Sequence, residues 1–366
     1  MSSDPAPAPV SIREVALPTG ARVGFGIVGT GMIAGFHAKA IAGLSGARLV
    51  GVCGRSSGPL VAFASVQGPV FATTRLEELV THPEVQIVCV TTPSGAHLEP
   101  ALAAAAAGKH VVVEKPLEIT RARATVLIEA CEKKGVRLVP IFQARFGEHA
   151  RRVKAAIERG RLGRLVLASV QVKWHRPASY YSGWKGTLSL DGGGALINQA
   201  IHGLDLLQWF AGLPAEVFAW KARRVHTGIE AEDTLCGSLR FPCGALGAIE
   251  ATTAAWPGWA RRVELCGETG SILLEDDRIV RWDCASIEAG DEILRGGAST
   301  LSQGSGASAP NSISTEGHRS QLQDLVDAIR LGRPALIDGR EGLKAVALVE
   351  ALYSSANSGR PMPVLL

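Results

Sequence analysis

The 366-residue chain has no apolar run long enough to span a bilayer, and residues 1–9 lack the basic start and apolar core of a signal peptide. It has seven cysteines but no Cys-x-x-Cys pair. An odd, scattered set of cysteines in a long chain is typical of a reducing compartment. We therefore expect a soluble, cytoplasmic protein without a membrane partner.

The sequence also lacks the marks of several functional classes. The net charge is only +4, which is too small to indicate a nucleic-acid partner. No histidine has the cysteine or carboxylate spacing of a zinc site, so no metal is predicted, and no Gly-x-Ser-x-Gly hydrolase elbow is present. Hydrophobic residues make up 46% and charged residues 20%, the balance of a globular protein that can bury a core.

Two parts of the chain differ in their hydrophobic pattern. Residues 23–140 alternate short apolar runs with amphipathic segments, which predicts an α/β fold with a doubly wound parallel sheet and right-handed crossovers. After residue 145, longer runs that alternate apolar and polar residues predict an α+β region with an antiparallel sheet that is covered on one face. A helix at about 202–211 is expected before most of that sheet.

The first apolar run ends in a glycine-rich turn that has the Gly-x-Gly-x-x-Ala form of the dinucleotide fingerprint. The turn comprises Gly29, Thr30, Gly31, Met32, Ile33 and Ala34. Gly29 permits the tight turn, Gly31 lets the backbone approach a pyrophosphate, and Ala34 lets the next helix pack closely on the strand. The helix N-terminus offers free N–H groups and positive potential. Its position between strand and helix favours a dinucleotide site over an ordinary turn.

The end of the second predicted strand lacks the acidic residue that usually binds the ribose hydroxyls of NAD. Arg55 and Ser56 stand there instead. Arg55 can pair with a 2′-phosphate and Ser56 can add a hydroxyl, which favours NADP over NAD as the cofactor. The alternative is that Arg55 only stacks on the adenine.

Further short motifs occur downstream of the turn. They are Thr92-Pro93-Ser94-Gly95-Ala96-His97, Glu114-Lys115-Pro116, Gly192-Gly193-Gly194-Ala195-Leu196 and Glu316-Gly317-His318. With the glycine turn, they resemble the glucose-fructose oxidoreductase / inositol dehydrogenase / rhizopine-catabolism (Gfo/Idh/MocA) oxidoreductase family over nearly the whole chain. The resemblance implies a Rossmann domain followed by a domain with a large, open, mainly antiparallel sheet. It also implies homodimers or homotetramers that form through this second sheet.

The resemblance places several residues at the cofactor. Thr92, Pro93 and His97 would lie by its ribose and nicotinamide end, and Glu114 and Lys115 would flank the nicotinamide. The alternatives are a plain strand-end turn at Thr92 and a solvated loop lysine at Lys115. The apolar strand before Lys115 directs it to the carboxyl-terminal edge of the sheet, where α/β proteins bind ligands.

The family usually has an aspartate four residues before its catalytic histidine, and Asn198 and His202 stand at these positions. On a helix both would face the same side. His202 is the expected acid-base residue, because an imidazole can change charge near neutral pH. Asn198 can hydrogen-bond a substrate hydroxyl but cannot ionise, so we expect the proton path to use His202 and Lys115 without a carboxylate. The alternative for His202 is a structural histidine capped by Asp205.

Five other residues are candidates for substrate contact. Four of them precede the glycine run and can line a sugar pocket, namely Tyr180, Tyr181, Trp184 and Lys185, although a structural aromatic cluster is the alternative. Arg145 can contact an anionic substrate group, and a surface salt bridge is the alternative.

Together these residues predict an NAD(P)-dependent oxidoreductase that transfers a hydride between nicotinamide and a hydroxyl or carbonyl carbon of a sugar, sugar derivative or cyclitol. Two alternatives stay open: a non-catalytic dinucleotide-sensing protein, and a glycosidase that recycles bound NAD. We predict a flexible segment at 1–20, a dinucleotide-binding domain at 21–142, and a substrate-binding and oligomerisation domain at 143–366. A mobile loop is expected at 296–314, which is rich in Gly, Ser and Ala.

Overall fold

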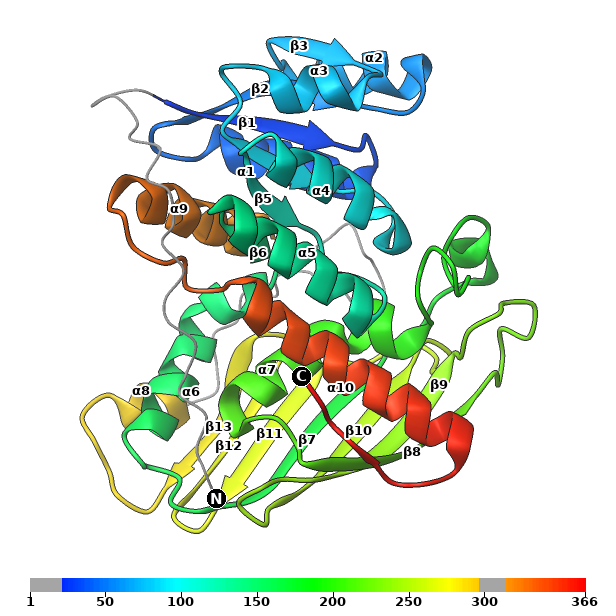
Figure 1. Cartoon of the computed structure of the whole chain (residues 1–366). Helices are drawn as coiled ribbons and strands as arrows, with labels where there is room; N and C mark the ends of the chain where they lie inside the picture. Colours follow the sequence, from blue (N-terminus) through cyan, green and yellow to red (C-terminus); the bar gives the residue numbers. More distant parts are fainter. Residues whose placement is uncertain (1–21, 296–313) are drawn as a thin grey trace, which may run out of the picture.

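The computed structural model describes residues 22–295 and 314–366. The predicted flexible segment at 1–20 and all but the last residue of the predicted loop at 296–314 lie outside the described residues. Figure 1 shows a parallel sheet with its helices above a second, larger sheet. This arrangement confirms the predicted order of an α/β fold followed by a region with a large, mainly antiparallel sheet.

The first sheet is fully parallel and has the strand order β3-β2-β1-β4-β5-β6. Its strands are β1 (Val23–Val28), β2 (Ala47–Cys53), β3 (Phe71–Thr73), β4 (Ile87–Val90), β5 (His110–Val113) and β6 (Leu138–Pro140). The helices that connect them are α1 (Met32–Ala42), α2 (Ser57–Gln67), α3 (Leu76–Thr81), α4 (Leu98–Ala106) and α5 (Arg121–Lys134). The strand order reverses between β1 and β4, and this switch point is where doubly wound folds bind dinucleotides.

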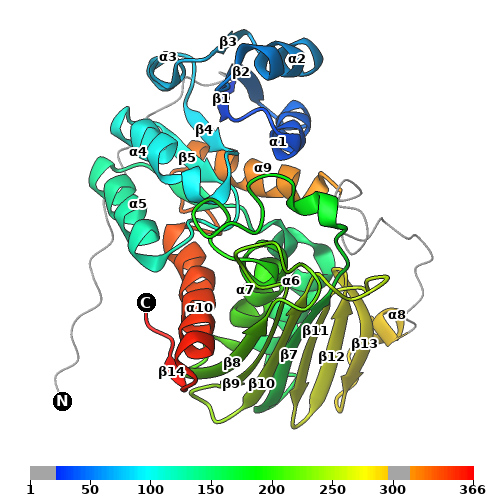
Figure 2. The ribbon, with the colours of Figure 1, turned by 90° about the vertical axis from the view of Figure 1, so that its right-hand side faces the viewer.

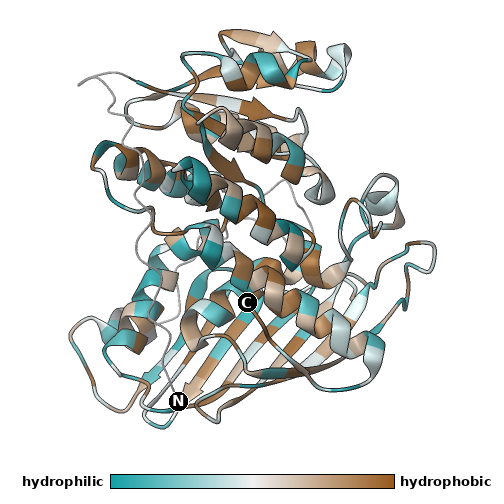
Figure 3. Cartoon of the chain, in the orientation of Figure 1, coloured by the Kyte–Doolittle hydropathy of each residue, from teal (hydrophilic) through white to brown (hydrophobic). Residues whose placement is uncertain are grey.

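Burial on both faces explains why the strands of this sheet are nearly continuous apolar runs. Every residue of β1, β4 and β5 is buried, and β1 and β5 appear brown in Figure 3. Separate apolar clusters cover the two faces, one built around Val90 and Leu127 and the other around Phe25 and Ile41.

The second sheet has eight strands in the order β13-β12-β11-β7-β10-β9-β8-β14. Its strands are β7 (Leu165–Lys173), β8 (Glu216–Ala222), β9 (Thr234–Arg240), β10 (Leu246–Thr252), β11 (Arg262–Gly267), β12 (Gly270–Glu275), β13 (Arg278–Cys284) and β14 (Met362–Pro363). Neighbouring strands are antiparallel except for β7 and β10, which are parallel. Neither β13 nor β14 was expected from the sequence.

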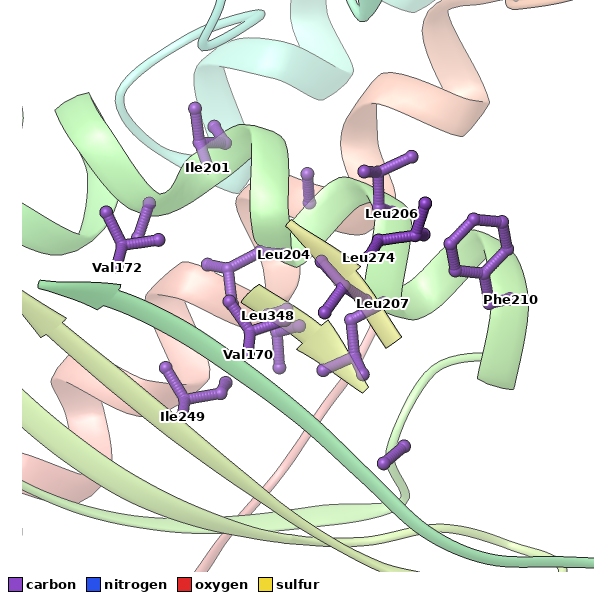
Figure 4. Close-up of a cluster of buried hydrophobic side chains, with 14 of the residues drawn as sticks. Val170, Val172, Ile201, Leu204, Leu206, Leu207, Phe210, Ile249, Leu274 and Leu348 are labelled. Atoms are coloured by element: carbon purple, nitrogen blue, oxygen red, sulfur yellow. The ribbon is translucent and has the colours of Figure 1, made fainter. Parts of the chain in front are cut away.

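Helices cover one face of this sheet and leave the other face open (Figure 2). The helices that follow β6 are α6 (Glu148–Glu158), α7 (Ile201–Ala211), α8 (Asp291–Arg295), α9 (Glu316–Arg330) and α10 (Gly339–Ser358). Figure 4 shows Leu204 and Leu207 of α7 packed with Val170 of β7 and Leu348 of α10. Each of these four residues is fully buried, and burying such a side chain stabilises the fold by about 1.5–3 kcal/mol.

The last two long helices return to the first sheet. Leu322, Leu325 and Val326 of α9 share an apolar cluster with β1 and α1, and Leu343 and Val346 of α10 share one with α5. The two sheets are therefore held together by a common C-terminal segment, and the predicted division at 142/143 stays a prediction. Among the described residues, no helix is both long and apolar enough to cross a membrane.

Candidate active site

The turn after β1 is shaped to admit a ligand to the backbone. Gly29 has φ +116°, and a Cβ there would lie 2.6 Å from Thr91 Oγ1, so only glycine fits. A Cβ at Gly31 would meet nothing within 4 Å. Gly31 caps α1 without a side-chain hydrogen bond, which leaves the first N–H groups of the helix free for an anion. The turn, including Thr30, Met32 and Ile33, fits a dinucleotide pyrophosphate.

The end of β2 lies beside this turn, because β1 and β2 pair in parallel and Gly29 N donates to Cys53 O at 2.8 Å. Arg55 and Ser56 follow and are exposed. Ser56 is the residue before α2, and its hydroxyl does not cap that helix. Both side chains are thus free to meet the adenosine end of a dinucleotide.

His97 is a buried link between two strand-end segments. Its ring nitrogens face backbone carbonyls, with Nδ1 3.0 Å from Pro116 O and Nε2 3.0 Å from Thr92 O. His97 therefore ties the Thr92-Pro93 turn after β4 to the segment after β5. Its expected place by the cofactor stays a prediction.

Glu114 is buried between two imidazoles and the backbone of Lys115. Oε1 accepts a hydrogen bond from His37 Nε2 at 2.8 Å and lies 3.4 Å from His318 Nε2, and Oε2 accepts from Lys115 N at 3.1 Å. Burial disfavours the carboxylate, but the neighbouring His318 and His37 imidazoles outweigh it and hold the pKa of Glu114 well below its usual range. Glu114 thus supports the backbone of Lys115, and its place beside the nicotinamide stays a prediction.

His37, Glu114 and His318 also have ligand atoms within 4.8 Å of one another, a spacing that a metal ion can bridge. We interpret the cluster as a hydrogen-bond network, because the bond between His37 and Glu114 already occupies the closest pair of atoms.

Lys115 reaches across to the second domain. Its Nζ donates to Asn198 O at 2.8 Å. Burial lowers the pKa of Lys115, whereas the carboxylates of Glu114 and Asp191 raise it in part. The strand end of the first sheet is thus in direct contact with the segment that carries the candidate histidine.

That segment is not a regular α-helix. Residues Ala195–Ala200 form a π-helical turn, and α7 begins at Ile201. Such turns occur frequently at functional sites. His202 lies in the first turn of α7, with a buried Nδ1 that has no hydrogen-bond partner among the described residues. Burial and the charges of Lys115 and Arg261 lower the pKa of His202 well below its usual value, so it is a neutral base at pH 7.

The structure supplies a carboxylate that the sequence analysis did not expect. Asp191 is buried, and its carboxylate accepts hydrogen bonds from Asn198 Nδ2 and, at 2.7 Å, from Gly186 N. Asn198 Oδ1 in turn accepts from Tyr180 Oη at 3.3 Å and Gln199 Nε2 at 2.6 Å. The amide is therefore oriented by its neighbours, and a carboxylate lies behind it rather than in its place.

Arg145 is a buried ion-pair residue. It is 5% exposed, and its guanidinium donates to both oxygens of Asp205, at 2.6 and 2.8 Å, and to Glu341 at 2.9 Å. The alternative of a surface salt bridge is wrong, because the pair with Asp205 is buried, and contact of Arg145 with substrate stays a prediction. The same contact removes Asp205 as a cap of His202.

The two aromatic candidates lie in the loop before the glycine run. Tyr181 Oη is 2.7 Å from Thr253 Oγ1 at the end of β10, and its ring packs on Tyr180 and His226. Trp184 is partly exposed. Their contact with substrate stays a prediction.

The residues that sequence reasoning missed are His37, His318, Asp191 and Gln199. The signals for three of them were weak but present: His37 on the apolar side of its helix, His318 in the Glu-Gly-His motif, and Asp191 directly before the glycine run. Gln199 gave no signal, since its partners Arg176 and Tyr180 lie 23 and 19 residues away in the chain.

The glycine turn lies at the switch point, and the contact of Lys115 with Asn198 brings the segment of the neutral His202 to the strand ends beside it. These features define a Rossmann-fold oxidoreductase. Comparison with known proteins identifies its family. Residues 23–142 match the model of the oxidoreductase family with the NAD-binding Rossmann fold, and residues 150–273 match the GFO/IDH/MocA C-terminal domain.

Individual relatives agree with this match. The WlbA dehydrogenase from Bordetella pertussis, solved with NADH and UDP-GlcNAcA, has a TM-score of 0.83 and 33% identity over 94% of this chain and 99% of that chain. Inositol 2-dehydrogenase of Rhizobium meliloti is 25% identical over 93% of this chain and 99% of its own length. The 1,5-anhydro-D-fructose reductase of Ensifer adhaerens is 31% identical over 61% and 67%. The chain belongs to the Gfo/Idh/MocA oxidoreductase family.

Proposed function

We propose that this NAD-binding oxidoreductase moves a hydride between the nicotinamide and a hydroxyl-bearing carbon of a sugar, sugar derivative or cyclitol. The observation that carries the proposal is the contact of Lys115 Nζ with Asn198 O, four residues before His202. This contact joins the end of β5, where Lys115 lies, to the segment that carries the neutral His202. The relatives named above act on or bind an inositol, an anhydrosugar and a sugar nucleotide.

In this mechanism the backbone of Gly29–Met32 and the strand ends at Thr92 and Pro93 hold the dinucleotide, which accepts or returns the hydride when it is bound. His202 removes the hydroxyl proton during oxidation, because its lowered pKa keeps it neutral. The Lys115 ammonium stabilises the negative charge that develops on the substrate oxygen. Asn198 orients the same hydroxyl, and Asp191 fixes the amide of Asn198.

We further propose that the site prefers NADP to NAD while accepting both. Support comes from the exposed Arg55 and Ser56 and from the lack of an acidic residue at the end of β2. The WlbA relative was solved with NADH, so we expect this fold to accept NAD as well.

The open face of the second sheet suggests how copies of the chain associate. Leu167, Trp220 and Leu246 on β7, β8 and β10 are 41%, 66% and 57% exposed, and Leu167 and Leu246 are register partners. Apolar side chains gathered on an open sheet support a homodimer or homotetramer formed through this face. All seven cysteines are free, which supports the cytoplasm as the compartment.

The test of the proposed chemistry is Lys115→Ala. We expect the turnover number to fall about 100- to 1,000-fold, because one electrostatic donor to the developing oxyanion is lost. Dinucleotide affinity, measured by nicotinamide fluorescence, should stay nearly intact. Oxidation of a polyol panel is followed by the absorbance of reduced nicotinamide.

Lys133→Ala, on the exposed end of α5, is the matched control for the loss of one positive charge. An equal loss of dinucleotide affinity and turnover in Lys115→Ala would show that Lys115 binds cofactor rather than serves the chemistry. Tight dinucleotide binding by the wild-type protein with no turnover of any polyol would favour the sensor, and release of an aglycone with permanently held dinucleotide would favour the glycosidase.

A further inference from the structure

Lys185 lies in the loop between the aromatic residues and the glycine run, and the proposed chemistry does not use it. The backbone beside it is held from two directions. Gly186 N donates to Asp191 Oδ2 at 2.7 Å, and Gly186 O accepts from Glu230 N at 3.1 Å and Ala231 N at 3.0 Å. The same loop is attached to the first domain, where Gly95 N donates to Leu190 O at 2.8 Å. Lys185 is therefore presented by a fixed main chain.

The ammonium of Lys185 lies over the ring of a tyrosine that contacts Asn198. Its Nζ lies 3.6 Å from the centroid of the Tyr180 ring, and Tyr180 Oη donates to Asn198 Oδ1. The charges of Lys115 and Asp191 both act on Lys185. Both lysines are thus linked to Asn198. Lys115 donates to its backbone oxygen, and Lys185 packs on Tyr180, which donates to its side chain.

Positively charged side chains outnumber carboxylates around Lys185. Three cationic side chains, Lys115, Arg176 and Lys185, act on one another, against the carboxylates of Glu114 and Asp191. Both carboxylates are already hydrogen-bonded to other groups. Within residues 22–295 and 314–366, Lys185 forms no ion pair with an acidic side chain.

Burial, with the charge of Lys115, lowers the pKa of Lys185 to about 8. A partly buried ammonium of this kind is stabilised when a negative group comes within contact distance. The side chain rests on an aromatic face, where a cation–π contact holds it without neutralising its charge.

We propose that Lys185 is the anion-binding residue of the substrate pocket and that the substrate is a sugar that carries a carboxylate, such as a uronic acid. The guanidinium of Arg176 already donates to His175 O and Gln199 Oε1, and Lys115 donates to Asn198 O. The Lys185 ammonium beside an aromatic ring then matches one carboxylate, whereas a phosphate is usually held by several donors. This inference rests on the proposed oxidation of a sugar hydroxyl, and it adds the charge of the substrate.

The experiment compares matched substrate pairs that differ in one carboxylate: D-glucose with D-glucuronate, and UDP-N-acetylglucosamine with UDP-N-acetylglucosaminuronate. The quantity measured is the ratio of kcat/KM for the acid to kcat/KM for the neutral sugar. In the wild-type protein we expect this ratio to be about 10 or more, and Lys185→Met should lower it about 10- to 100-fold, as for the loss of one charge-assisted hydrogen bond. Lys185→Arg should retain most of the preference.

A second readout does not depend on turnover. Binding of each sugar to the NADH-loaded protein is followed by nicotinamide fluorescence, and the acid should bind more tightly than its neutral partner in the wild-type protein but not in Lys185→Met. Lys133→Met, which removes an exposed charge on α5, should leave both ratios unchanged.

The outcomes separate this inference from the proposed function. Oxidation of neutral and acidic sugars with equal kcat/KM, an equal effect of Lys185→Met on both members of a pair, or a preference for glucose 6-phosphate over glucuronate would overturn the carboxylate subsite alone. Dinucleotide binding without oxidation of any sugar would overturn the proposed function, and the inference with it.

Discussion

The glycine turn after β1 and the network around Asn198 are built in opposite ways. The turn is made by consecutive residues, Gly29 to Met32, and offers mainly backbone N–H groups. The network is made by side chains and carbonyls that are far apart in the chain, with Lys115, Asp191 and Asn198 contributed by different elements. A site of the first kind depends on local backbone shape, whereas a site of the second kind depends on the packing of two domains.

Because of this difference, we expect a single side-chain substitution in the network around Asn198 to change turnover. The affinity for dinucleotide should stay unchanged. The largest effect is expected for His202→Asn. Loss of the general base should lower the turnover number about 100- to 10,000-fold, with little change in dinucleotide affinity measured by fluorescence titration.

The pH dependence of the wild-type protein sharpens this prediction. Burial and the charges of Lys115 and Arg261 lower the pKa of His202, so the neutral base form persists as pH falls and is lost only below the usual imidazole range. The acid limb of kcat for alcohol oxidation should therefore lie below pH 6.5 and should be missing in His202→Asn. An acid limb at pH 7 or above, or a parallel loss of dinucleotide affinity, would contradict the assignment.

An intermediate effect is expected for Asp191→Ala. The change leaves Gly186 N and Asn198 Nδ2 without their acceptor, which should lower the free energy of unfolding by about 1–3 kcal/mol. Turnover should fall about 10- to 100-fold, because Asn198 is no longer held in one orientation. Urea unfolding and kcat of the folded fraction are measured together, with Asp191→Asn as the variant that keeps the shape. A loss of stability with unchanged kcat would make Asp191 a purely structural residue.

The smallest effect is expected beside the glycine turn, for Arg55→Ala. This exposed residue should contribute a preference for the 2′-phosphate, so the ratio of NADP affinity to NAD affinity should fall about tenfold. Arg48→Ala is the control, because Arg48 lies on β2 and is paired with Glu84. An unchanged ratio in Arg55→Ala would remove the argument for NADP.

The sequence was sufficient for the parallel sheet, because each of its strands is a short apolar run followed by an amphipathic helix. It was less informative for the second sheet, where β13 (Arg278–Cys284) alternates polar and apolar residues near the end of the pattern and was not recognised. The π-helical turn at Ala195–Ala200 was also missed, since its composition does not distinguish it from an α-helix. Asn198 and His202 nevertheless share one segment, as their spacing suggested.

The sequence did not show the protein partners of Arg145, Glu114 and His97. All three were expected at ligands, and the structure shows each buried against protein groups: Arg145 on Asp205, Glu114 on His37 and His97 on two carbonyls. Residue type shows that a group can bind an anion, donate or ionise. It does not show which partner is nearest, because these partners lie 60, 77 and 5 to 19 residues away along the chain.

The amino-acid sequence by itself indicated the family, the order of the two folds and the expected place of the dinucleotide, because these follow from short motifs, local periodicity and glycines within one turn. Tertiary structure alone decided that Lys115 reaches Asn198, that Asp191 supports the amide and that Lys185 lies over the ring of Tyr180. These contacts bring together groups from separate elements, and only the folded chain sets the burial and the neighbouring charges that fix their protonation.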